Sequence, residues 1–267
     1  MFGSGSPKPG IRRRRPKFGQ ISPKEESSIK TLGLQALRRR LISPVGLLVY
    51  KSRVRLRKRK THARAWLQVR YRRFLAQPIR LVVGASGDRY SGWVTTEQDF
   101  FDLTDPKSLR RFIGGAKVQA FLLEHVLEHL TYEEATRAVE RLLNFQTSHG
   151  TIRIAVPDGN HPSSRYQEVA GIDGPDGHLH LWTLADAERL ASNVRCVMDA
   201  IEYFTVEGDF ASRFVDNDRV PSDERGLVSR SAINSEQRAD HDDFAPFGYT
   251  SLIFDLIHGP EADSGNR

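Results

Sequence analysis

Hydrophobic and polar positions follow clear periods in the middle and near the end of the chain. Short runs rich in apolar or β-branched residues, typical of strands, occupy residues 79–83, 93–96, 118–123, 152–156, 196–204 and 250–257. A 3.6-residue period predicts a helix over residues 132–145, and further helices are expected through Phe112 and over residues 183–192. Strands that alternate with helices predict an α/β fold with a doubly wound, mostly parallel, Rossmann-like sheet.

Two further helices are predicted ahead of the sheet, over residues 28–41 and 60–76. In the second helix the apolar residues expected near one face, surrounded by arginines, are Ala63, Trp66, Leu67, Tyr71 and Phe74. This pattern predicts a basic amphipathic helix.

Composition changes along the chain and suggests its division. Residues 1–27 predict a disordered basic tail, 28–78 a basic helical arm, 79–258 the α/β domain and 259–267 a flexible tail. Residues 208–247 form a polar insertion within that domain. Cys196 is the single cysteine, which excludes an intrachain disulfide, and no apolar run approaches the roughly 18 residues of a membrane-spanning helix. We expect a cytoplasmic protein, with peripheral membrane contact as an option.

Charge is divided unevenly between the two parts of the chain. Residues 1–80 hold 23 Lys and Arg against two acids, a net charge of +21, whereas residues 81–267 hold 17 against 31, a net charge of −14. The basic arm could bind nucleic-acid phosphates such as those of RNA, lie on an anionic membrane, or pack on the domain with its charges solvated. An organellar transit peptide is a fourth reading of the first 24 residues. The sequence leaves these open.

Polar and small residues follow the expected strands where each one ends. A loop that starts at Gly84 follows the first strand, Glu97 follows the second, and Glu124 follows the third. The carboxyl ends of parallel strands meet at one edge of a sheet, where nucleotides bind in folds of this kind. The sequence therefore predicts a nucleotide-type pocket and a cofactor-using enzyme.

Several ordered blocks also resemble the class I S-adenosylmethionine-dependent methyltransferases. These blocks read IRLVVGASGD, GWVTTE, EHVLEHL, RIAVPDG, HPSSRYQEV, EYFTVEGDF and YTSLIFDLI, and they span roughly residues 79–257. The third glycine of the longer fingerprint is missing, and the Lys-Pro-Gly-Gly turn common in the family is replaced by residues 147–150, predicted here as a turn. The resemblance implies S-adenosyl-L-methionine as cofactor and in-line methyl transfer to a nucleophile.

The resemblance also implies roles for individual residues. Gly84, Ser86 and Gly87 would contact the methionine part of the cofactor, and Glu97 would accept both ribose hydroxyls. Asp102 would approach the adenine. An alternative for the segment after Glu97 is purely local, with Thr104 or Asp105 capping the next helix.

Glu124 and His125 would face the transferable methyl group, where either could orient the cofactor and His125 could act as a base. Asp158 could be a base or a substrate anchor, or simply form a turn before Gly159. His178, in a loop-rich stretch, is a candidate for substrate contact.

The string His125-x-x-Glu128-His129 also matches an inverted zinc-protease motif. That motif needs a long helix, whereas here the string follows a strand and the next helix begins at a capping box of Thr131 and Glu134. We therefore expect no metal, and expect Glu128 and His129 to hold the turn through hydrogen bonds.

These residues predict a methyltransferase that acts on a small-molecule, glycan or lipid-linked acceptor. The alternative is a catalytically inactive domain of the same fold that binds anionic membrane or RNA through its basic arm.

Overall fold

The computed structural model describes residues 44–85, 90–172, 174, 177–213 and 250–258. Its strands are β1 (Arg80–Val83), β2 (Val94–Thr95), β3 (Val118–Glu124), β4 (Gln146–Pro157), β5 (Cys196–Phe204), β6 (Phe210–Ser212) and β7 (Ser251–His258). Its helices are α2 (Pro44–Phe74), α3 (Pro106–Ile113), α4 (Tyr132–Leu143), α5 (Ser164–Ala170) and α6 (Leu184–Asn193), with a 3₁₀ turn η1 (Leu127–His129). The chain divides into two compact units between Arg57 and Lys58.

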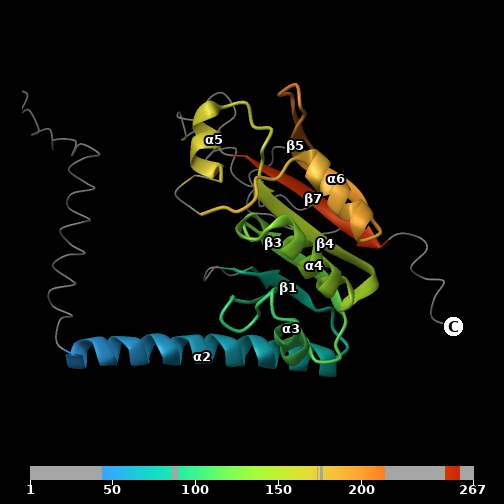
Figure 1. The fold of residues 1–267 in the computed structure, drawn as a ribbon. Helices are drawn as coiled ribbons and strands as arrows, with labels where there is room; N and C mark the ends of the chain where they lie inside the picture. Colours follow the sequence, from blue (N-terminus) through green and yellow to red (C-terminus); the bar gives the residue numbers. More distant parts are fainter. Residues whose placement is uncertain (1–43, 86–89, 173, 175–176, 214–249, 259–267) are drawn as a thin grey trace, which may run out of the picture. The chain divides into compact units, whose positions relative to one another are not determined.

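The strands form one seven-stranded sheet in the order β2-β1-β3-β4-β7-β5-β6 (Figure 1). Neighbouring strands from β2 to β4 pair in parallel, whereas β7 pairs antiparallel with both β4 and β5. Strand β5 therefore runs in the same direction as β4, and only β6 and β7 are reversed. The predicted Rossmann-like, mostly parallel class is confirmed. Strand β6 was not predicted and lies at the start of the expected polar insertion, whose residues 214–247 are outside the described residues.

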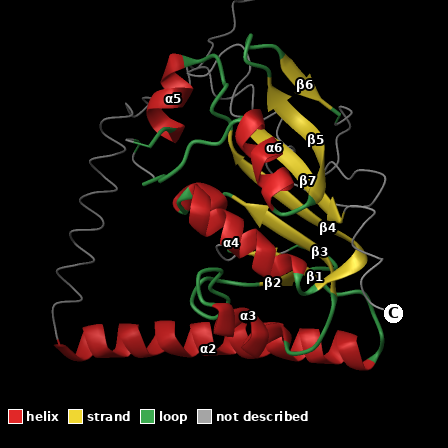
Figure 2. Ribbon diagram, turned by 45° about the vertical axis from the view of Figure 1, so that its right-hand side comes forward, coloured by secondary structure: helices red, strands yellow, loops and turns green. Residues whose placement is uncertain are grey.

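Alternate residues of each central strand enter different apolar clusters, as the two-residue period of a strand requires. The main cluster takes one set from the strands together with buried residues of α2, α3, α4 and α6. The residues between them, such as Val82 and Leu122, form separate clusters on the other side of the sheet. Helices α4 and α6 lie side by side across one face of the sheet in two views (Figures 1 and 2). The described helices that pack on the sheet thus gather on this face.

Side-chain caps fix where the helices begin. The Thr131 hydroxyl accepts a hydrogen bond from the backbone N–H of Glu134, whose carboxylate accepts one from the N–H of Thr131, so the predicted capping box of α4 is confirmed. Asp105 caps α3 by accepting from the N–H of Lys107, as the local alternative proposed. These caps satisfy backbone N–H groups that the first turn of each helix leaves without a partner within the helix.

Helix α2 packs on the domain through small residues and leaves its large apolar residues exposed. Ala65 and Val69 are buried in the main core, and the ring of His62 stacks on Phe100 with centroids 4.7 Å apart. The predicted apolar set is instead exposed, including Leu67 at 58% and Phe74 at 85%. Of the uses left open for this arm, packing on the domain through these apolar side chains is therefore not what the structure shows, and the buried contacts come from Ala65 and Val69.

Strand β4 begins earlier than predicted. It starts at Gln146, so the expected turn at residues 147–150 belongs to the strand. Register shifts there, because Val118 pairs with Gln146 whereas Ala120 pairs with Thr151. The extra residues of β4 form an irregularity of the bulge type, so the strand continues through residues that were expected to form a turn.

Among the described helices, none is long and apolar enough to cross a membrane.

Candidate functional site at the carboxyl edge of the sheet

The ends of β1 and β2 are tied together by backbone hydrogen bonds. The N–H of Ala85 donates to the carbonyl oxygen of Thr96 (2.9 Å), and the N–H of Thr96 donates to that of Val82 (2.8 Å). These bonds extend the ladder past the strand ends and fix the start of the Gly84 loop beside the residue that follows Thr96. Glu97, which is partly exposed, is therefore held at the same edge as Gly84.

Gly84 adopts a conformation that favours glycine. Its φ is +67°, and a Cβ at this position would lie 3.0 Å from Cγ2 of Val126. Both the left-handed backbone and the close approach of Val126 argue against any larger residue. The chain can thus present bare backbone at the end of β1. Ser86 and Gly87, predicted to contact the same ligand, lie outside the described residues.

Glu124 ends β3, the strand on the other side of β1. Its carboxylate accepts a hydrogen bond from the hydroxyl of Tyr90, which comes from the loop between β1 and β2. The register places Val83 opposite Leu123, so Gly84 and Glu124 are at matching heights on neighbouring strands. Tyr90 was not anticipated, because nothing in a loop sequence reveals which strand end its side chain reaches.

His125 turns sharply away from the strand. It has a φ of +52°, uncommon for a residue with a side chain, while its N–H still donates to the carbonyl oxygen of Ala155 on β4 (2.9 Å). Its Nδ1 lies 3.0 Å from Oε1 of Glu128, which is fully buried. A carboxylate accepts, so Nδ1 donates and Nε2 is the atom that can take up a proton. The strained backbone and the Glu128 contact fix the orientation of this ring.

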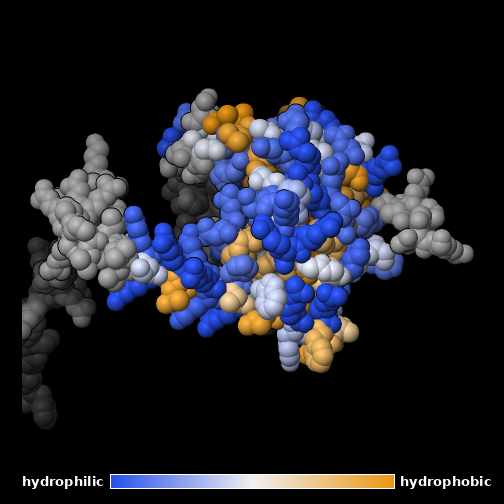
Figure 3. Space-filling view, turned by 60° about the horizontal axis from the view of Figure 1, so that its bottom comes forward, coloured by the Kyte–Doolittle hydropathy of each residue, from blue (hydrophilic) through white to orange (hydrophobic). Residues whose placement is uncertain are grey.

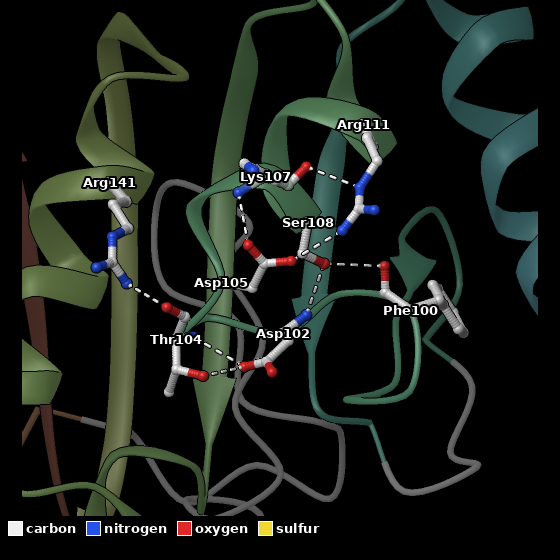
Figure 4. Close-up of polar contacts among 8 residues, drawn as sticks. All are labelled: Phe100, Asp102, Thr104, Asp105, Lys107, Ser108, Arg111 and Arg141. Carbon is white, nitrogen blue, oxygen red and sulfur yellow. Dashed lines mark hydrogen bonds and ion pairs between the residues drawn. The ribbon is translucent and has the colours of Figure 1, made fainter.

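Asp102 is engaged in a local turn (Figure 4). Its Oδ1 accepts from the N–H and the hydroxyl of Thr104, at 2.8 and 2.7 Å, and its own N–H donates to Oγ of Ser108. The guanidinium of Arg141 on α4 donates to the carbonyl oxygens of Leu103 and Thr104. Asp102 therefore helps to shape the segment between β2 and α3. Its predicted approach to an adenine stays a prediction; within the described part of the chain, the hydrogen bonds of this carboxylate are made by Oδ1.

Asp158 lies beneath the surface and joins two strand ends. It is fully buried, its Oδ1 accepts from the N–H of Asn160 (2.9 Å), and its Oδ2 accepts from the N–H of Phe204 at the end of β5 (2.7 Å). Burial raises the pKa of Asp158 from 3.8 to about 6, although both backbone hydrogen bonds oppose the rise. Both oxygens of this carboxylate therefore hold backbone groups, and neither is exposed to solvent. The geometry favours the turn-forming alternative over the predicted base or anchor.

Tyr166 reinforces this junction from α5, a helix that was not predicted. Its hydroxyl donates to the carbonyl oxygen of Thr250 (2.7 Å) and accepts from the N–H of Asp158 (3.0 Å). The ring of His161 stacks on Tyr166 with centroids 4.0 Å apart. The residues after β4 thus brace the sheet at this end.

Three of the predicted pocket residues share one edge of the sheet, at the ends of β1, β2 and β3: Gly84, Glu97 and Glu124. His125 adjoins Glu124. These groups suit a nucleoside-containing ligand. Gly84 presents backbone without a side chain, and the carboxylate of Glu97 is able to accept hydrogen bonds from two vicinal hydroxyl groups. Asp158 follows the carboxyl end of β4 but is fully buried, whereas Glu97 and Glu124 are partly exposed.

No protein-family model matches the chain, and no curated protein sequence matches it. Among solved structures, a SAM-dependent methyltransferase from Archaeoglobus fulgidus is 11% identical with a TM-score of 0.36, over 71% of this chain and 91% of that one. Magnesium protoporphyrin IX methyltransferase from Synechocystis PCC 6803, with bound SAH, is 10% identical with a TM-score of 0.36, over 84% and 100%. LepI in complex with SAM is 14% identical with a TM-score of 0.33, over 53% of this chain but 37% of LepI, so the chain spans less than half of LepI. Likeness of this size assigns no activity to the chain.

Proposed function

We propose that the chain is an S-adenosylmethionine-dependent methyltransferase whose catalytic domain is residues 79–258. The observation that carries the proposal is the tie between the ends of β1 and β2, which holds Glu97 beside the Gly84 turn. The seven sequence blocks that resemble the family add support, because they occur in the family's order. The acceptor is proposed as a small molecule, a glycan or a lipid-linked glycan.

The site residues would divide the cofactor between them. Glu97 would accept the two ribose hydroxyls, which matches the role of an acid after the second strand in this architecture. Gly84 would bring backbone close to the methionine part, with Ser86 and Gly87 expected beside it. Glu124 would orient the cofactor near its sulfonium. The cofactor itself would supply a methyl group bound to a positively charged sulfur atom, and this sulfur is a good leaving group.

His125 would act as the base that takes a proton from the acceptor. Its Nδ1 faces the buried carboxylate of Glu128 at 3.0 Å, an arrangement in which a carboxylate orients a histidine ring. With Nδ1 engaged, Nε2 is the basic atom. The larger part of the acceleration would come from holding the acceptor in line with the methyl group, since alignment removes much of the entropic barrier.

Calorimetric titration of S-adenosylhomocysteine into the full-length protein tests the cofactor site. We expect micromolar affinity, and at least a tenfold loss in Glu97→Ala, equivalent to about 1.4 kcal/mol. Glu140→Ala is the matched control, because Glu140 is an exposed carboxylate on the second half of α4, away from this edge. Absence of binding in the wild-type protein, or equal affinity in the two variants, would refute the assignment of Glu97.

A second function, peripheral contact with an anionic membrane, is favoured by the exposed side of α2. Trp66, Leu67, Tyr71 and Phe74 are exposed at 38%, 58%, 63% and 85%, on a segment whose other exposed residues include several arginines. Figure 3, in which the lower side of Figure 1 comes forward, shows hydrophobic groups scattered among hydrophilic ones. Basic residues with exposed aromatic rings are typical of helices that lie in a membrane interface.

Vesicle co-sedimentation tests this second function. The vesicles contain about 30 mol% phosphatidylserine, and the salt concentration is constant. We expect the double variant Leu67→Ser/Phe74→Ser to bind them more weakly than the wild-type protein, because buried apolar area adds to the attraction between charges. Binding that is equal in the double variant, or binding to RNA in preference to vesicles with a steep salt dependence, would indicate a phosphate-binding arm instead.

A further inference from the structure

A cluster of metal-ligating side chains lies next to the candidate site, outside the set that would hold the cofactor. One ligand atom each from Glu128, His129 and His178 lie within 4.8 Å of one another. Glu128 and His129 belong to η1, whereas His178 precedes α6 and is 50 residues away in the sequence. The rings of His129 and His178 approach edge to face, with centroids 5.0 Å apart.

Glu128 carries the observation that points to a ligand. Its side chain is fully buried, and its Oε2 has no hydrogen-bond partner among the described residues. Its Oε1 faces Nδ1 of His125. A buried carboxylate oxygen without a donor costs on the order of 1–3 kcal/mol or more. A bound cation removes that cost.

His178 is already arranged as a metal ligand. It is buried, and its Nδ1 lies 2.7 Å from the carbonyl oxygen of Ala170. A carbonyl oxygen only accepts, so Nδ1 carries the proton and Nε2 keeps its lone pair. Metal-bound histidines are commonly oriented by such a hydrogen bond from the second ring nitrogen to a carbonyl group.

The backbone holds the two segments in place. The carbonyl oxygen of Glu128 accepts hydrogen bonds from the N–H groups of Leu179 (2.7 Å) and His180 (3.2 Å). The residue that supplies the carboxylate therefore also anchors the loop that supplies His178. Ligand atoms in a tetrahedral zinc site are about 3.3 Å apart, from bond lengths near 2.0–2.2 Å. His129, which is exposed, can rotate to close the remaining gap.

We propose that Glu128, His129 and His178 bind one Zn²⁺ ion, with the fourth coordination position open to water or to an oxygen of a substrate. Two imidazoles and one carboxylate are a known set for zinc sites with an open position. The inverted zinc-protease string would instead have paired His125 with His129, and no metal was expected from the sequence. The structure brings His178 to His129 instead and directs Nδ1 of His125 to the carboxylate.

Zinc binding by the full-length, tag-free protein tests the proposal. After dialysis against a chelator and then metal-free buffer, ZnCl₂ is titrated calorimetrically, and Co²⁺ replaces Zn²⁺ for visible spectroscopy. We expect one ion per chain, tetrahedral Co²⁺ absorption that Zn²⁺ abolishes, and an affinity at least tenfold weaker in His129→Ala. His129 is exposed, so its replacement should leave the fold intact; circular dichroism checks this.

His149→Ala is the matched control, since His149 is exposed on β4 and outside the cluster. Glu128→Gln provides a second variant that keeps the shape of the buried side chain while removing its charge, and we expect it to weaken Zn²⁺ binding at least tenfold. Equal affinity in His129→Ala and His149→Ala, or no stoichiometric binding in the wild-type protein, would overturn the proposal. Either result is independent of S-adenosylhomocysteine affinity, so the two sites are tested separately.

Discussion

Arg153 on β4 and Asp255 on β7 face each other as a register pair and form a fully buried, two-pronged ion pair. Nε of Arg153 donates to Oδ1 of Asp255 at 2.8 Å, and its second terminal nitrogen donates to Oδ2 at 2.9 Å. The pair links the parallel part of the sheet to the reversed strand β7. Planar guanidinium and carboxylate groups match each other in this geometry.

Removal of one partner of this pair should destabilise the protein strongly. We expect Asp255→Ala to lower the free energy of unfolding by about 3–5 kcal/mol, because the buried guanidinium of Arg153 would lose both of its hydrogen bonds to this carboxylate. The double variant Arg153→Met/Asp255→Leu should recover part of this loss by replacing the pair with apolar packing. Urea denaturation measures both. A loss below about 1 kcal/mol in Asp255→Ala would contradict the buried position of the pair.

Asp158 should give the protein a measurable dependence on pH. Burial raises the pKa of Asp158 from 3.8 to about 6. Between these two pH values the carboxyl group is protonated in the folded state and has lost its proton in the unfolded state. The stabilisation from that proton is present below pH 4 and is lost as the pH rises through about 6, amounting to about 3 kcal/mol.

Asp158→Asn should remove this slope, since an amide does not titrate. The measurement is the free energy of unfolding between pH 4 and 7 in both proteins, with Asp209→Asn, an exposed aspartate, as the control. The same slope in wild type and Asp158→Asn would show that other groups produce it.

A side chain at Gly84 should destabilise the protein for two reasons, the positive φ and the close approach of Val126. Gly92 shares only the positive φ, so comparing the two positions separates these effects. Both glycines have positive φ, +67° and +79°, but a Cβ at Gly92 has no atom within 4 Å, whereas one at Gly84 lies 3.0 Å from Val126. We expect Gly92→Ala to cost about 1–2 kcal/mol from the backbone alone, and Gly84→Ala to cost more. Chemical denaturation compares them. Equal losses would mean that Val126 moves aside freely.

The C-terminal half of α2 should behave as part of the folded core. Val69 is fully buried in the main cluster, whereas Leu67 is 58% exposed. We expect Val69→Ala to lower the free energy of unfolding by about 2 kcal/mol, and Leu67→Ala to change it by less than about 0.5 kcal/mol. Thermal and urea unfolding measure both. A larger loss in Leu67→Ala than in Val69→Ala would mean that the face containing Leu67 is the buried one in solution.

Local patterns account for what could be predicted. Strand and helix periods depend on neighbours a few residues away, which is why β3, α4 and the capping box of Thr131 and Glu134 followed from the sequence. The order of polar strand ends predicted that Gly84, Glu97 and Glu124 share an edge, because parallel strands leave little choice in where their ends lie.

The sequence by itself determined the class of the sheet and the residues at its carboxyl edge. Only the tertiary structure decided that α2 buries Ala65 and Val69, that Asp158 lies beneath the surface, and that His178 meets Glu128 from 50 residues away. Each of these depends on which distant surfaces pack together, and no local period records that choice. The same packing leaves Oε2 of Glu128 without a donor among the residues that the structure describes, so the proposed zinc site could be recognised only once the fold was known.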